Sequence, residues 1–302
     1  MNFNLTKKLL KLSCLFLLNL AIISCNNNDY NKLEDFTIEI PDENFEALLI
    51  EQGIDSDGII NQQILKSDAK KVITLDLSTS NNTIESIKGI EAFLNLKKLA
   101  AYGQDIKEVD LSNNKKLNTV YLQGNFLTTI DISNNKNLVF ADFSSNIITS
   151  ITGVSEALKL KELQLSYNLI EEFSMHNSSI EKLLMSGNLL TSFNASGSAN
   201  LNYLLLRQNL LTELDLFQNT VLEHIIVDHN QIETINLPAN NNIKYLNLHT
   251  NNLSELNISM YPNIIKLTVN DNPNLSCVKS LNNQNIPTII KSDYQELNEF
   301  CN

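Results

Sequence analysis

Residues 201–211 read Leu-Asn-Tyr-Leu-Leu-Leu-Arg-Gln-Asn-Leu-Leu, and variants of this stretch recur along most of the chain. An asparagine marks each copy, at intervals of 20 to 22 residues. Apolar residues stand eight, five and three positions before each asparagine. A fixed period in this range is typical of a solenoid, in which each copy forms one coil. The asparagines of the series are Asn125, Asn146, Asn168, Asn188, Asn209, Asn230, Asn251 and Asn272.

The pattern matches the unit of a leucine-rich repeat, Leu-x-x-Leu-x-Leu-x-x-Asn-x-Leu. Its central part alternates with period two, so it predicts a strand whose leucines point into the coil. Stacked coils then form one parallel sheet with about 4.8 Å per coil. The asparagine amide has donors and an acceptor for buried backbone groups, which explains a ladder of one residue type. Gln104 takes this place in an earlier coil.

The expected fold is an α/β-type leucine-rich repeat solenoid. Its curved parallel β-sheet forms the concave face, and short strands and turns form the convex face. We expect about ten coils between residues 72 and 275. A second alternation in most coils predicts the convex strands, at 109–111, 130–132, 214–216, 235–237 and 256–258.

Two coils carry glycine on the convex side instead, at Ile87-Lys88-Gly89-Ile90 and Ile151-Thr152-Gly153-Val154. These two resemble the repeats of the internalin family. The 21-residue majority resembles the short-repeat proteins that Bacteroidetes export and the internalin-like proteins with 21-residue coils. The resemblance covers roughly residues 40–302 and implies a bacterial leucine-rich repeat lipoprotein. The modules that follow the repeats in internalins are missing, so a role in host invasion does not carry over.

The N-terminus predicts export and lipid attachment. Three lysines precede an apolar stretch of 12 residues, which is too short to span a bilayer. Ser24-Cys25 and the polar run after it resemble a bacterial lipobox, although Ile22 and Ile23 depart from it. We therefore expect a signal peptide at 1–24 and a lipid-anchored tether at 25–35. The alternative is an ordinary secretory signal with an incidental cysteine.

Charge and cysteine content restrict the partners. The first 24 residues hold three lysines and no acidic residue, so the processed chain has 19 basic and 34 acidic residues, a net charge of −15. Such a charge argues against binding nucleic acid or an anionic membrane surface, so membrane attachment must come from lipid. Cys277 and Cys301 remain in an exported chain, which favours a disulfide over two free thiols.

Segments at the two ends of the repeats are expected to cap the solenoid. At 36–71, Asp42 is suited to cap a helix that ends at Gly53, and Ile64 with Leu65 suggests a second short helix. Asp55-Ser56-Asp57-Gly58 between them resembles part of a calcium loop. In that register Gly53 and Ile64 fall where carboxylates are needed, so a turn is the favoured interpretation. The disulfide cap is expected at 276–302.

The residues two, four and six positions before each ladder residue should face the concave side. Water-exposed positions need no apolar side chains, yet two groups of them stand there, which indicates partner binding. The competing explanation is that strand propensity alone favours these residue types. The first group is Leu184, Tyr203, Leu205, Ile226 and Tyr245; the second is Tyr102, Tyr121 and Phe140.

No catalytic or cofactor site is expected. His224, Asp228, His229 and His249 fall close together, but neighbouring strand side chains diverge, so a solvated or partner-binding patch is favoured over a metal. The predicted function is a lipid-anchored recognition module of the cell envelope, most simply at the outer membrane, on its periplasmic or its outer side. It would act as a monomer and bind a protein or glycan through the concave face. The alternative is an envelope scaffold without a dedicated ligand.

Overall fold

The computed structural model describes residues 36–79, 82–239 and 242–301. The chain divides into two compact units, Met1–Phe36 and Thr37–Asn302, and the second unit contains nearly all the described residues. The expected signal peptide, the tether and Cys25 lie outside the described residues.

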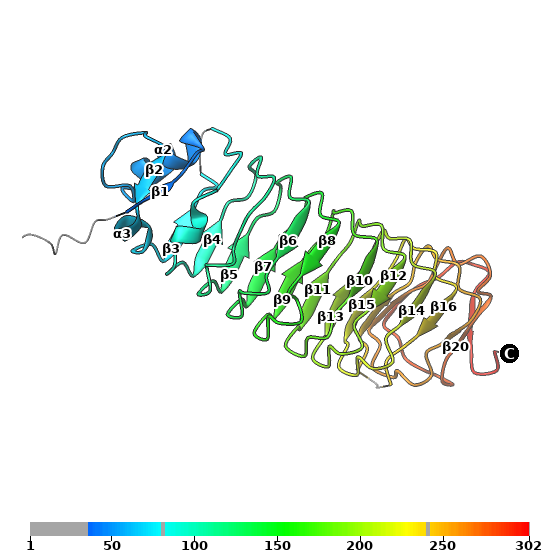
Figure 1. Ribbon diagram of the computed structural model, residues 1–302. Helices are drawn as coiled ribbons and strands as arrows, with labels where there is room; N and C mark the ends of the chain where they lie inside the picture. Colours follow the sequence, from blue (N-terminus) through cyan, green and yellow to red (C-terminus); the bar gives the residue numbers. More distant parts are fainter. Residues whose placement is uncertain (1–35, 80–81, 240–241, 302) are drawn as a thin grey trace, which may run out of the picture. The chain divides into compact units, whose positions relative to one another are not determined.

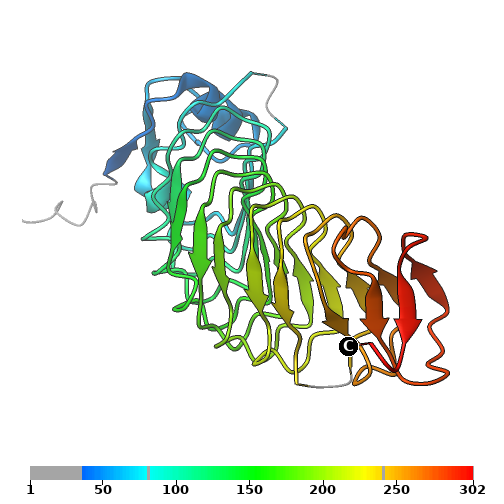
Figure 2. The ribbon, with the colours of Figure 1, turned by 90° about the vertical axis from the view of Figure 1, so that its right-hand side faces the viewer.

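One parallel sheet of 11 strands runs through the second unit (Figures 1 and 2). Each coil contributes one strand of three residues, and consecutive coils pair in register, as in Leu183 with Leu204 and Leu204 with Ile225. In order, the strands are β3 (Thr74–Asp76), β4 (Lys98–Ala100), β5 (Thr119–Tyr121), β7 (Phe140–Asp142), β9 (Glu162–Gln164), β11 (Lys182–Leu184), β13 (Tyr203–Leu205), β15 (His224–Ile226), β17 (Tyr245–Asn247), β19 (Lys266–Thr268) and β21 (Thr288–Ile290).

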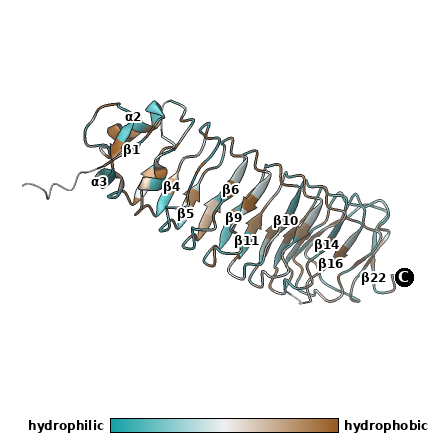
Figure 3. Ribbon diagram, viewed as in Figure 1, coloured by the Kyte–Doolittle hydropathy of each residue, from teal (hydrophilic) through white to brown (hydrophobic). Residues whose placement is uncertain are grey.

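The middle residue of each strand points into the coil, and its two neighbours point outward. Leu183, Leu204 and Ile225 are fully buried, whereas the residues on either side of them retain exposure. Much of the hydrophobic colouring in Figure 3 accordingly lies on the strands. The core is a single column of apolar side chains along the second unit. The predicted leucine-rich repeat solenoid is confirmed.

The ladder asparagines connect each coil to the one before it. In Asn251, Nδ2 donates to the carbonyl oxygens of Val227, one coil back, and Leu248, both at 3.1 Å. Its Oδ1 accepts the amide of Ile232 at 2.9 Å. The same three bonds recur at each asparagine from Asn125 to Asn272. The residue directly before each ladder residue, including Gln104, has positive φ. These residues are Gly103, Gly124, Ser145, Tyr167, Gly187, Gln208, His229, Thr250 and Asp271.

A second ladder lies on the opposite side of the coil, and the sequence analysis missed it. Asn114, Asn135, Asn177 and Asn219 are fully buried. Asn135 Nδ2 donates to Leu111 O at 2.9 Å and to Asn114 O at 3.2 Å, and the other three make equivalent bonds to the preceding coil. Their spacing in multiples of 21 residues, with an apolar residue three positions after each, could have revealed them.

The convex strands form short separate sheets. Strands begin one residue before most of the predicted segments, and residues 109–111 form no strand. The pairs and triplet are β6 (Thr129–Asp131) with β8 (Ser150–Thr152), β10 (Glu172–Ser174) with β12 (Ser192–Asn194), β14 (Glu213–Asp215) with β16 (Thr234–Asn236), and β18 (Leu256–Asn257) with β20 (Cys277–Lys279) and β22 (Glu296–Asn298). In the first of the two coils that carry glycine on the convex side, the 3-10 helix η1 (Ile90–Ala92) replaces a strand.

The N-terminal cap contains one helix of the predicted kind, α2 (Glu43–Glu51), with Asp42 Oδ1 accepting from the amides of Asn44 and Phe45. The second helix was misplaced. Ile64 and Leu65 belong to β2 (Gln63–Leu65), which pairs antiparallel with β1 (Thr37–Glu39), and only Lys66–Ala69 forms the short α3. β-branched Ile64 pairs with Ile38 across this ladder, so tertiary pairing overrides the helical spacing.

The C-terminal segment 276–301 continues the stack instead of only closing it. β21 adds the eleventh strand of the main sheet, and β20 and β22 extend the convex side. Buried Gln295 occupies the ladder place, where its Nε2 donates to Val269 O at 3.1 Å. A search for asparagine does not find this coil. Cys277 and Cys301 form a disulfide bond, with Cα atoms 5.7 Å apart, that ties the last residues to β20.

Candidate functional site

An outward-facing apolar strip lies across β11, β13 and β15. Leu184, Leu205 and Ile226 stand side by side at the last position of three adjacent strands. All three are half-buried although their side chains lie outside the coil. Neighbouring outward side chains are therefore packed against one another, and together they offer a continuous apolar surface.

Three aromatic rings lie in a row beside the strip. Tyr203, His224 and Tyr245 occupy the first position of β13, β15 and β17. The His224 ring centroid lies 5.2 Å from that of Tyr203 and 4.7 Å from that of Tyr245, and the second pair is stacked at 8°. Burial lowers the pKa of His224 below its ordinary value, which favours a neutral ring. The sequence analysis assigned both tyrosines to this group but not the histidine between them.

The second predicted group is only partly assembled. The Tyr121 and Phe140 rings lie 5.1 Å apart, and Lys98 Nζ stands 5.4 Å from the Tyr121 centroid. Tyr102 is exposed, and no ring contact joins it to the other two in the part of the chain that the structure describes. This cluster is smaller than the strip, and one face of Tyr121 is already engaged by Lys98.

A polar hollow of about 520 Å³ adjoins the strip. Asp228 lies at its centre and is almost fully buried. The Asp228 carboxylate forms an ion pair with Arg207, 3.0 Å from its Nε, and accepts from His229 Nδ1 at 2.8 Å and Asn247 Nδ2 at 2.9 Å. The lining residues are Ser166, Tyr167, Ser186, Leu205, Arg207, Ile226, Asp228, His229, Asn247 and His249.

The structure separates the histidines that the sequence grouped. His229 and His249 meet edge to face with ring centroids 5.0 Å apart, whereas His224 belongs to the ring stack. Neither Ser166 nor Ser186 hydrogen-bonds to a histidine within the described ranges. Over the same residues, no three His, Cys, Asp or Glu side chains are placed to hold a metal ion.

A row of exposed apolar residues along one edge of the solenoid was not singled out from the sequence. Each member directly follows a ladder asparagine in five consecutive coils, and each is about two-fifths to one-half exposed. In the sequence, these residues could have been recognised by their fixed position directly after the ladder asparagine. The row consists of Phe126, Ile147, Leu169, Leu189 and Leu210.

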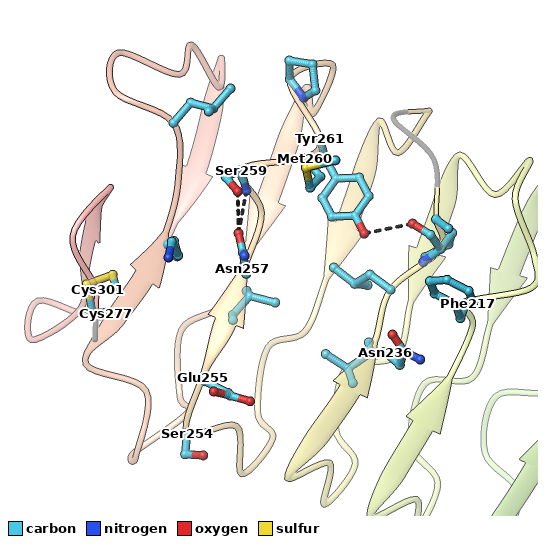
Figure 4. Close-up of a pocket in the computed structure, with 18 of the residues that line it drawn as sticks. Phe217, Asn236, Ser254, Glu255, Asn257, Ser259, Met260, Tyr261, Cys277 and Cys301 are labelled. Carbon is cyan, nitrogen blue, oxygen red and sulfur yellow. Dashed lines mark hydrogen bonds between the residues drawn. A yellow bond between two sulfur atoms is a disulfide. The ribbon is translucent and has the colours of Figure 1, made fainter.

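The convex side has a larger hollow of about 1160 Å³ near the C-terminal end (Figure 4). It opens where β16 and β18 do not pair. Tyr261 stands in it, and its hydroxyl donates to Pro238 O at 2.9 Å. Phe217 and Met260 on its rim are exposed, and the Cys277–Cys301 disulfide lies at one side. Its charged lining residues are Glu255 and Lys279.

The segment that resembled a calcium loop contains a buried carboxylate. Asp55 is 3% exposed, and neither of its oxygens has a hydrogen-bond partner in the described residues. Burial, and secondarily the charge of Asp57, raises the pKa of Asp55 above its ordinary value. Asp57 is occupied by local bonds to Ile59 N and Asn61 Nδ2. The arrangement is a turn with one costly buried acid.

Replacing Asp55 by asparagine is expected to raise the free energy of unfolding by about 1 kcal/mol at pH 7. A raised pKa in the folded state means that the folded chain resists ionisation, so stability falls as pH rises above the pKa of the unfolded chain. The gain should therefore shrink toward pH 4. Urea denaturation at both pH values measures it, with the exposed Asp293→Asn as control. Equal effects of Asp55→Asn at pH 4 and pH 7 would contradict the burial of this charge.

None of the described helices is long and apolar enough to cross a bilayer. No protein-family model matches the chain, and no curated protein sequence matches it.

Solved structures do match. A TDR receptor superimposes with a TM-score of 0.53 at 17% identity, over 74% of this chain and 48% of the receptor. Internalin C2 from Listeria monocytogenes gives 0.50 at 20% identity, over 64% of this chain and 86% of that protein. The plant peptide hormone receptor RGFR1, solved with RGF2, gives 0.51 at 15% identity, over 74% of this chain and 44% of the receptor. These similarities establish the fold: the chain is a leucine-rich repeat protein.

Proposed function

We propose that this chain is a lipid-anchored recognition protein of the bacterial cell envelope, which binds a protein partner through its concave sheet. The observation that carries the proposal is the strip of Leu184, Leu205 and Ile226 with its flanking rings. Three adjacent aliphatic side chains face outward there, although the coil core is complete without them. Exposed apolar surface of this kind is typical of binding sites.

The concave surface also lacks the negative charge of the rest of the chain. The outward positions of β4 to β19 and of the turns after them carry four basic residues, Lys98, Lys182, Arg207 and Lys266. They carry four acidic residues, Asp142, Glu162, Asp228 and Asp271. The processed chain has 19 basic against 34 acidic residues, so its negative charge lies mainly elsewhere. An apolar, nearly neutral sheet surface fits the centre of a protein interface, where charged residues are depleted.

The fold supports the same role. Solenoids present extended surfaces that bind partners, and RGFR1 was solved with a bound peptide hormone. Three aligned aliphatics in a fixed register suit a protein partner better than a glycan, for which separate ring platforms would be expected.

The partner-binding test is a crosslinked pull-down from intact cells with Leu184, Leu205 and Ile226 changed together to serine. We expect crosslinked partners to fall by at least tenfold, with little change in melting temperature, because the three side chains lie outside the core. The matched control changes Leu169, Leu189 and Leu210 of the exposed edge row to serine. Loss of partners in the control alone would move the site to that edge. Unchanged partners in both variants would favour a scaffold.

The anchoring test concerns Cys25, which the proposal makes the acylated residue at the outer membrane. Cys25→Ser should abolish labelling by a fatty-acid analogue and release the protein from the membrane fraction, because two or more acyl chains supply the membrane affinity. Fractionation and label incorporation measure this directly. A variant that remains labelled and membrane-bound would exclude lipid attachment at Cys25.

A further inference from the structure

We infer that the polar hollow beside the strip is an anchor subsite for a carboxylate group of the bound partner, held by the guanidinium of Arg207. This inference rests on the proposed function and assigns the chemistry of one part of the same surface. The partner segment would place an apolar side chain on the strip and a carboxylate in the hollow, because Leu205 and Ile226 belong to both.

Arg207 is held in place by one contact and keeps nitrogen donors available. Only its Nε is engaged, by Asp228 at 3.0 Å, and its side chain is 49% exposed. Its two terminal nitrogens have no hydrogen-bond partner in the described residues. The other bonds of Asp228, to His229 and Asn247, fix the carboxylate and hence the orientation of Arg207. A guanidinium with two free parallel donors matches the geometry of a carboxylate.

A second, independent feature points into the same hollow. Ser186 is 6% exposed, and its hydroxyl has no hydrogen-bond partner within the described ranges. It precedes Gly187, whose amide donates to Arg207 O at 2.8 Å, so the serine and the arginine stand on adjacent coils. A buried hydroxyl without a partner costs free energy, and Ser186 lines the same hollow as Arg207.

Tyr167 forms part of the wall of the hollow. Tyr167 adopts the left-handed conformation, φ 59°, that most other turns give to glycine or a small or polar residue. A Cβ on Gly187 would lie 2.7 Å from the Tyr167 ring, so glycine at 187 lets the ring lie across the next coil. The same conformation recurs at five other non-glycine residues of the ladder turns, so it belongs to the coil. The Tyr167 ring lines the hollow together with Ser186 and Arg207.

The experiment uses two positional-scanning hexapeptide libraries and the purified lipoprotein in detergent. One library has free carboxyl ends and the other has amidated ends, which separates a chain-end carboxylate from an aspartate or glutamate side chain. We expect selection of a carboxylate next to an apolar residue. Against the best peptide, Arg207→Gln should weaken binding by about 10- to 100-fold. Arg207→Lys should recover part of the loss, and the exposed charge-matched control Lys136→Gln should bind like the parent.

The decisive comparison is a double-mutant cycle. Replacing the peptide carboxylate by an amide should weaken binding to the parent as much as Arg207→Gln does, and should weaken binding to Arg207→Gln no further. Additive losses would overturn the anchor. The anchor would also be overturned by a peptide whose binding the strip variant abolishes but which shows no preference for an acidic group. That outcome would leave the proposed function intact. If the protein binds no peptide of either library, or binds a glycan array but no peptide, the proposed recognition of a peptide carboxylate is wrong.

Discussion

Asn251→Leu is expected to lower the free energy of unfolding by about 3 kcal/mol. The substitution leaves the amide of Ile232 without its acceptor inside the coil. The carbonyls of Val227 and Leu248 each lose one of two donors and keep the other, from Asn230 Nδ2 and Asn272 Nδ2. Each buried polar group left unpaired costs roughly 1 to 3 kcal/mol, and leucine offers no replacement bond. Urea denaturation followed by circular dichroism measures the loss.

Asn252 is the matched control for that experiment. It adjoins Asn251, its side chain is exposed, and its amide makes only one long bond, 3.5 Å to Gln231 O. Asn252→Leu should therefore change stability by less than about 0.5 kcal/mol. Similar losses in the two variants would show that the effect comes from leucine in the turn, and would refute the role of the buried amide.

Glu46→Ala should release the N-terminal cap, with a local loss of about 3 kcal/mol. Glu46 is fully buried, and its carboxylate accepts the amides of Asn61 at 3.0 Å, Gln62 at 2.8 Å and Gln63 at 3.1 Å. Bonds to a charged acceptor are among the stronger ones in proteins, and alanine supplies none of them. The loop that leads into β2 would then lack its attachment to α2.

Hydrogen exchange is the measurement for this variant, because a solenoid can open at one end while the remaining coils stay folded. Amides of 45–65 should exchange faster by about two orders of magnitude, and amides of β11 to β17 should not. The exposed Glu51→Ala is the control on the same helix and should leave the cap protected. Equal acceleration of exchange along the whole chain would argue against a separately held cap.

The repeat pattern predicted the stack of coils and the outward direction of the strip because both follow from local rules. A period of about 21 residues requires identical coils, and alternation within a strand fixes which side chains enter the core. Leu183, Leu204 and Ile225 accordingly lie inside, and Leu184, Leu205 and Ile226 lie outside. Whether that outer surface binds a partner is the subject of the pull-down.

Other features were out of reach because they depend on residue types that change from coil to coil. Gln295, whose side chain is longer, takes the place of a ladder asparagine, so the eleventh strand was not recognised. Ile64 pairs with Ile38, a partner 26 residues earlier in the chain, which no local window reveals. The second asparagine ladder is interrupted, with Ser198 midway between Asn177 and Asn219, and therefore passed unnoticed.

By itself the sequence determined the coil, its period and the identity of the core, since these repeat with the chain and need only short-range geometry. The tertiary structure decided which outward residues meet. Arg207, Asp228 and His249 are separated by 21 residues each in sequence, yet stacking places them on consecutive coils around one hollow. The same stacking of coils brings the rings of Tyr203, His224 and Tyr245 next to one another. Side-chain contacts between coils depend on the size and rotamer of each residue, and a repeating pattern carries no information about those.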